Sequence, residues 1–267
     1  VITGWSSGEI TAHRLLDGRL HWSVNTTAPA YGIQGELTEV PANNEILVPI
    51  ETGIISLNPN NGNENWKMTF SDNARGYRHS ATFWYENQDT WYVTGNENGH
   101  LTMWNSTNPE QATTIDFEIT NGKIRSSMLV LNPRELLIPI QSNNGSVLIH
   151  WKDDVREDHH VMIGSFGIMT MADNNVIVPT SHNTTWWEFN NSLQYRVQLT
   201  NQPVTGKVES LGFEMFALPI NTEQGKIEVY RLNIISSTTD LAWVWTPSVS
   251  NYMISGLGHD KQYNACL

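Results

Sequence analysis

The sequence is poor in cysteine, in positive charge and in long apolar runs, and each shortage excludes a class of protein. Cys266 is the only cysteine among 267 residues, so no intramolecular disulfide can form. Lysine and arginine number 15 against 27 acidic residues, and the formal net charge of −12 argues against a nucleic-acid backbone or an anionic membrane as the main partner. The longest apolar runs, such as 46–50, fall far short of the roughly eighteen residues that a membrane span needs. The first residues show no basic region followed by an apolar stretch, so no signal peptide is visible.

Short apolar strands that end in proline or glycine are the most frequent feature. With 39% hydrophobic and 10% aromatic residues, the chain can bury a substantial core. The residues that close these strands are Gly4, Pro49, Gly95, Pro139, Pro179 and Pro219. Successive members are 45, 46, 44, 40 and 40 positions apart. A period of this size is typical of repeat proteins with four strands in each unit.

The order of segments within each repeat predicts the fold class. After the closing residue come a polar turn, an alternating strand, a third strand and a segment of small residues that suits an innermost strand. The first copy lacks an inner strand and the last copy lacks partners, so we expect the C-terminal strand to pair with the N-terminal strands and close a ring. The sequence therefore predicts one all-β domain over residues 1–267, a six-bladed β-propeller. The blades are expected at about 30–70, 75–119, 122–163, 165–199, 204–245, and 250–267 joined with 1–24. A ring of seven or eight blades, of which this sequence is a part, is the alternative.

Two stretches carry the pattern of a known repeat family. Residues 9–22 and 54–66 run from an alternating strand through a turn with Asp or Asn and Gly to a closing tryptophan. They resemble the quinoprotein-type propeller repeat, a group that contains pyrroloquinoline quinone dehydrogenases and non-catalytic relatives in outer-membrane assembly. Residues 98–105 are equally similar to a WD-type repeat. The enzyme branch of the quinoprotein family implies a calcium site, a catalytic Asp and a vicinal disulfide. One cysteine cannot form that disulfide, so the resemblance favours the non-catalytic branch, with no catalytic residue and no cofactor.

Basic residues recur where one repeat passes to the next. We expect these loops to surround the mouth of the channel and to bind a protein partner, or an anionic or carbohydrate ligand. The candidates are Arg75, Tyr77, Arg78, His79, Lys123, Arg125, Lys207 and His259. The alternative is that they form ion pairs with acidic neighbours in the sequence, namely Asp72, Glu118, Glu209 and Asp260.

A second candidate is a divalent metal site in the polar stretch 150–160. Carboxylates and imidazoles bind such metals, and the ligands here would be Asp153, Asp154, Asp158 and His160. The alternative is a solvated turn between two strands, since the spacing matches no established metal motif.

Eleven tryptophans raise a third candidate, a carbohydrate-binding propeller. Indole faces stack on sugar rings, and Trp84, Trp186 and Trp187 are the residues that could do so. Trp22, Trp66, Trp243 and Trp245 occupy strand positions and are expected to pack between blades instead.

Five Asn-x-Ser/Thr sequences are possible glycosylation sites and favour an extracytoplasmic location, whether secreted, periplasmic or lumenal. The acceptors are Asn25, Asn105, Asn144, Asn183 and Asn190. The leading hypothesis is a non-enzymatic binding or scaffold propeller that engages a protein partner through the loops of one face. The alternatives are a carbohydrate-binding propeller and a quinone- or metal-dependent enzyme.

Overall fold

The fold is all-β, as the repeat predicts. The computed structural model describes residues 1–26, 33, 37–70, 77–143, 145–153, 155–162, 164–204, 206–221, 225–248, 254, 257, 259–260 and 265–266. Apart from the short 3-10 helix η1 (Pro41–Asn43), the regular elements of these residues are strands. None of the helical structure in this part of the chain has the length and hydropathy to cross a membrane. The chain forms two compact units, Val1–Asn144 with Trp151–Glu157, and Gly145–His150 with Asp158–Leu267.

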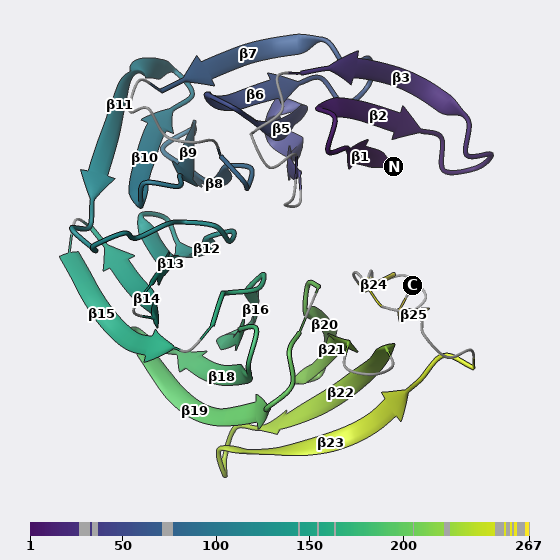
Figure 1. The fold of residues 1–267 in the computed structure, drawn as a ribbon, viewed down its shortest axis with the longest axis vertical. Helices are drawn as coiled ribbons and strands as arrows, with labels where there is room; N and C mark the ends of the chain where they lie inside the picture. The colour runs from purple at the N-terminus through teal and green to yellow at the C-terminus, as the bar shows by residue number, and fades with distance from the viewer. Residues whose placement is uncertain are drawn as a thin grey trace. The chain divides into compact units, whose positions relative to one another are not determined.

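The first unit contains three antiparallel sheets (Figure 1). The three-stranded sheet has the order β1 (Ile2–Gly4), β2 (Glu9–His13), β3 (Leu20–Asn25). The next sheet has the order β4 (Thr38–Val40), β5 (Glu45–Ile50), β6 (Gly53–Leu57), β7 (Glu64–Thr69). The third has β8 (Thr82–Glu86), β9 (Asp89–Gly95), β10 (His100–Asn105), β11 (Asn108–Asp116), again in chain order. A further four-stranded sheet is formed by β12 (Leu129–Asn132), β13 (Glu135–Ser142), β14 (Gly145–Lys152), β15 (Val155–Met162).

The second unit repeats the same pattern. One sheet has the order β16 (Thr170–Ala172), β17 (Asn175–Pro179), β18 (Thr184–Phe189), β19 (Leu193–Thr200). The next has the order β20 (Glu209–Gly212), β21 (Met215–Asn221), β22 (Gly225–Asn233), β23 (Thr238–Trp245). The described tail adds β24 (His259–Asp260) paired with β25 (Ala265–Cys266). Five four-stranded sheets thus occur among the described residues, in agreement with the predicted four-strand repeat.

Burial explains why the strands of one sheet have different sequence patterns. All residues of β5 and β6 are buried, because middle strands are covered on both faces, and they are accordingly almost entirely apolar. The outer strand β7 alternates instead between exposed and half-buried residues. Only one of its faces packs, so the sequence shows the period of two.

A tryptophan of the outer strand packs one sheet on the next in the first unit. Trp22 of β3 donates a hydrogen bond from Nε1 to the carbonyl oxygen of Pro59 at 2.9 Å. It lies in a cluster with Ile10 of its own sheet and Leu57 of the following sheet. The turn after β6 needs glycine here, because Gly62 has a φ of +74° and a Cβ would lie 2.7 Å from the Trp22 ring.

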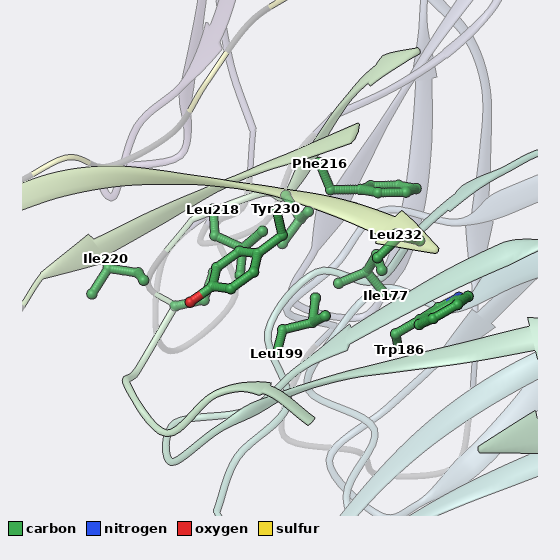
Figure 2. Packing of buried hydrophobic residues seen from close by; sticks show 10 residues of the cluster. Ile177, Trp186, Leu199, Phe216, Leu218, Ile220, Tyr230 and Leu232 are labelled. Carbon is green, nitrogen blue, oxygen red and sulfur yellow. The ribbon is translucent and has the colours of Figure 1, made fainter. Parts of the chain in front are cut away.

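In the second unit, too, buried side chains of two consecutive sheets pack against each other (Figure 2). Ile177 of β17 and Trp186 of β18 lie in one cluster with Phe216 and Leu218 of β21 and with Leu232 of β22. Aromatic and branched side chains from two consecutive sheets therefore close a single apolar layer.

Trp243 and Trp245 on the outer strand β23 are not buried between two sheets in this way. They are 44% and 49% exposed, whereas the sequence predicts that they pack between blades. No described residue encloses this face of β23. The sheet expected next combines residues 1–24 with 250–267, and most of 250–267 lies outside the described residues. Within the described residues, the sheet of β1, β2 and β3 has three strands.

Candidate functional site

The turn between β9 and β10 places one acidic side chain among basic ones. In this turn, the side-chain Oδ1 of Asn96 accepts hydrogen bonds from the backbone N–H groups of Asn98 and His100, at 2.9 and 3.1 Å. Gly99 has a φ of +79°, and a Cβ there would lie 2.8 Å from the carbonyl oxygen of Gly122. The turn is therefore fixed by its own side chains and touches the segment that leads to the next sheet. Glu97 lies at its tip.

Three cations surround the Glu97 carboxylate. Arg125 donates from Nε at 2.9 and 3.0 Å to the two oxygens and from Nη2 at 2.7 Å. Nε of Arg78 lies 2.5 Å from Oε1, and Nζ of Lys123 lies 3.8 Å from Oε2. The Glu97 side chain is 4% exposed, whereas those of Arg78, Arg125 and Lys123 are 16%, 29% and 37% exposed. We call these residues, with His79, the Glu97 cluster.

The Glu97 cluster carries a net positive charge at neutral pH. Burial alone would raise the pKa of Glu97, but the hydrogen bond from Arg125 and the charge of Arg78 outweigh it and lower that pKa. Burial, reinforced by the charge of Arg78, lowers the pKa of His79 to about 4, so its ring is neutral. Three cations against one carboxylate leave a charge of +2 in a protein whose formal net charge is −12.

His79 forms the inner side of this cluster. Its Nδ1 lies 3.5 Å from Oγ of Ser127, and its Nε2 is shielded from solvent with no hydrogen-bond partner among the described residues. A protonated imidazole would need a partner for that second N–H group and would face Arg78. The site therefore keeps the ring uncharged, and the available positive charge is that of Arg78, Lys123 and Arg125.

The structure brings together four of the eight basic and aromatic candidates: Arg78, His79, Lys123 and Arg125. Glu97 contacts the three cations of this cluster, and it is not among the acids expected from proximity in the sequence. Tyr77 is 1% exposed and packs against Phe70 in the core. Lys207 is half-buried in the second unit, just before β20. Arg75 and Asp72 lie outside the described residues, and the side chains of His259 and Asp260 are not among those described.

Of the residues proposed as metal ligands, Asp153 and Asp154 fall between β14 and β15, whereas Asp158 and His160 belong to β15. Asp153 is in the turn, with a φ of 44°, and forms an ion pair with Arg134 at 3.4 Å. Asp154 lies outside the described residues, as do the side chains of Asp158 and His160. Elsewhere in the described part of the chain, no three His, Cys, Asp or Glu residues are grouped as metal ligands would be.

The tryptophans proposed to stack on sugars are enclosed by protein. Trp84, Trp186 and Trp187 are 4%, 0% and 2% exposed. Trp186 Nε1 donates to Oδ1 of Asn175 at 2.9 Å, which is a contact within the sheet. These three side chains have no open face for a sugar ring.

The glycosylation acceptors differ in exposure. Asn25 and Asn190 are exposed, and Asn105 and Asn183 are half-buried. Nδ2 of Asn105 donates to Asp89, and Nδ2 of Asn183 donates to Gln198. Asn144 lies outside the described residues.

Sequence comparison alone finds nothing: no family model and no curated protein matches this chain. Solved structures do match. BamB from Moraxella catarrhalis has a TM-score of 0.63 and 13% identity, over 96% of this chain and 75% of its own. The C-terminal WD40 domain of Sif2 has a TM-score of 0.66 and 17% identity, over 97% of this chain and 71% of its own. The computationally designed Ika8 protein has a TM-score of 0.57 and 13% identity, over 97% of this chain and 87% of its own.

The fold is that of a β-propeller. Both repeat resemblances noted in the sequence have a counterpart here, the quinoprotein type in BamB and the WD type in the Sif2 domain. At this low identity the likeness shows the propeller fold and no more, so the function has to be argued from the site.

Proposed function

We propose that this propeller is a non-enzymatic binding protein that engages an acidic segment of a protein partner through the Glu97 cluster. The observation that carries the proposal is the excess of charge: three cations lie around one buried carboxylate, and Lys123 is 37% exposed. Lys123 is the most exposed of the three and lies farthest from the carboxylate, at 3.8 Å. A carboxylate delivered by a partner could accept charge-assisted hydrogen bonds from it and from the exposed parts of the two guanidinium groups.

The arrangement suits binding better than chemistry. Glu97 is already held by Arg125 through three hydrogen bonds, so it is a poor proton acceptor. His79 is neutral, but its ring is occupied with Ser127 on one side and shielded on the other. What these residues offer to a ligand is fixed, preorganised positive charge.

The test uses fluorescein-labelled hexaglutamate as the probe and fluorescence anisotropy over a range of NaCl concentrations. We expect binding that weakens with salt, because the attraction is between charges near the surface. Lys123→Gln should remove the ion pair that Lys123 forms with a carboxylate of the probe. An exposed pair is worth about 1 kcal/mol or less, which corresponds to a loss of affinity of up to about fivefold. Lys123 is the right position because it contributes least to holding Glu97.

Arg19→Gln is the matched control. Arg19 is an exposed cation that pairs with an acid, Asp17 at 3.6 Å, as Lys123 pairs with Glu97, but it lies in the turn between β2 and β3, away from the other two cations of the cluster. Its removal should leave the anisotropy curve unchanged. Hexaglutamate that does not bind at low salt, or that loses affinity equally with both variants, contradicts the proposal.

Two further features belong to this proposal and rest on the sequence. We infer that the propeller has six blades and that the residues around 250–267 complete the sheet of β1, β2 and β3. Deleting 250–267 should then lower the melting temperature, because β1 would keep an open edge. An unchanged melting temperature would contradict ring closure. The extracytoplasmic location rests on the acceptor sequences, of which Asn25 and Asn190 are exposed.

A further inference from the structure

A small apolar pocket lies in the first unit between β7 and the start of β11. Its volume is about 270 Å³, and its floor and walls are formed by Trp66 and Met68 of β7, Tyr92 of β9, Trp104 of β10 and Pro109 of β11. Trp104 and Tyr92 are 1% and 0% exposed, so they close the floor, whereas Trp66 and Met68 are half-buried and form a wall.

The aromatic floor of the pocket is rigid. The buried carboxylate of Glu45 accepts a hydrogen bond from Nε1 of Trp66 at 2.8 Å and one from the hydroxyl of Tyr92 at 2.7 Å. The rings of Tyr92 and Trp104 stack at 5.5 Å, and Trp66 meets Trp104 edge-on at 6.1 Å. Groups held in this way need no reordering when a ligand arrives, which lowers the entropic cost of binding.

Two charges of opposite sign flank the pocket. Lys67 and Glu110 are both exposed, and neither side chain forms an ion pair or hydrogen bond with any other residue that the structure describes. A ligand that fills the pocket would therefore meet a cation on the β7 side and an anion on the β11 side. The charge pattern favours an occupant that carries both signs around an apolar group.

The strand beside the pocket is an open edge. β11 is the outermost strand of its sheet, nine residues long, and all but one of its residues are exposed. β7 is likewise outermost in its own sheet. An outer strand presents unpaired backbone donors and acceptors, and an extended peptide can add to such an edge and place alternate side chains in adjacent pockets.

We propose that this pocket anchors one aromatic side chain of an extended partner segment that runs along β11. Its volume lies just below the roughly 300–1,000 Å³ of sites for drug-sized ligands and suits a single large side chain. The flanking residues of the segment are a base opposite Glu110 and an acid opposite Lys67. This inference rests on residues other than those of the Glu97 cluster and stands independently of the function proposed for it.

The probes are two capped pentapeptides, Lys-Thr-Trp-Thr-Glu and Glu-Thr-Trp-Thr-Lys, each with 5-fluorotryptophan at the centre and followed by ¹⁹F NMR. Residues two apart in an extended peptide lie on one face, so the aromatic ring and both charges point the same way. We expect one of the two orders to bind at least fivefold more tightly than the other. The same peptide with alanine at the centre should compete with the fluorinated peptide at least tenfold less well.

Pro109→Trp should abolish binding because the indole would fill the mouth of the pocket. The matched control is Pro133→Trp, which alters an exposed proline in the turn between β12 and β13 and should leave binding intact. Glu110→Lys should lower the affinity for the preferred peptide at least threefold and reverse which of the two charge orders binds more tightly. Thermal unfolding of each variant verifies that the fold is kept.

Three outcomes would overturn the inference. Binding that survives Pro109→Trp, or an alanine peptide that competes as well as the tryptophan one, shows that the pocket is not the anchor. Binding of 5-fluoroindole as tightly as of the peptides shows a small-molecule site and no peptide site. Lys123→Gln should leave peptide binding unchanged, so a failure here and a failure of the Glu97 cluster are told apart.

Discussion

The neutral state of His79 makes a specific prediction for stability against pH. Its pKa is about 4 in the folded protein, against 6.5 for an unperturbed histidine, because burial and the charge of Arg78 both disfavour the imidazolium. Between these two values the unfolded chain binds a proton that the folded chain does not. Stability is therefore fully present above pH 6.5 and falls as the pH is lowered towards 4.

The size of the effect follows from the difference between the two pKa values. About 2.5 pH units at about 1.36 kcal/mol each give an upper limit of about 3 kcal/mol. The value of about 4 already includes the charge of Glu97, which raises the pKa of His79. Replacing His79 with a residue that does not titrate removes its pH-dependent contribution to the free energy of unfolding. His79→Gln does so and keeps a polar side chain of similar length.

Urea unfolding of the wild type and of His79→Gln at half-unit steps between pH 4 and pH 8 tests this. The free energy of unfolding of the wild type minus that of the variant should be constant above pH 7 and should then decrease as the pH falls. Taking the difference cancels the other histidines and the carboxylates, which titrate in both proteins. A difference that does not change with pH, or that grows as the pH falls, would refute the reasoning about burial.

Two other predictions concern single positions. Gly62→Ala should lower the free energy of unfolding by at least about 2 kcal/mol, since it adds strain at a positive φ and a Cβ within 2.7 Å of Trp22. Gly18→Ala should cost only about 1 kcal/mol, because Gly18 also has a positive φ, at +67°, but a Cβ added there would meet no atom of the described residues within 4 Å. Thermal or urea denaturation measures both, and equal losses would contradict the packing role of Gly62. On secretion from a eukaryotic host, Asn190 should carry a glycan and Asn183 should not, because Nδ2 of Asn183 is held by Gln198; intact mass spectrometry of Asn190→Gln and Asn183→Gln checks this.

The repeat was predictable because strand periodicity is a local property. Middle strands such as β5 are almost entirely apolar, outer strands such as β7 alternate, and glycine or proline marks the ends, so the four-strand unit is visible without coordinates. The grouping of Arg78 with Arg125 was predictable for a related reason. Corresponding positions of consecutive repeats lie near each other in a propeller.

The partner of those cations was not predictable from proximity in the sequence. Glu97 lies 28 residues before Arg125, and the acids nearest to the cations along the chain are different ones. One signal did exist: Glu97 is the only acid in the Asn96–Gly99 turn, which occupies the same end of its sheet as the basic segments. The burial of Trp186 and Trp187 was equally hidden. They are consecutive and point to opposite faces of β18, and only tertiary packing covers both faces.

The contacts of Glu97 also affect how this chain can change during evolution. Its carboxylate holds Arg78 from the segment before β8 and Arg125 from the segment before β12, so two consecutive repeats share one counter-ion. Duplicating or deleting a single repeat at this point would separate Glu97 from one of these two guanidinium groups. These two repeats are thus expected to be inherited together, as a pair that recombination cannot separate without loss of stability.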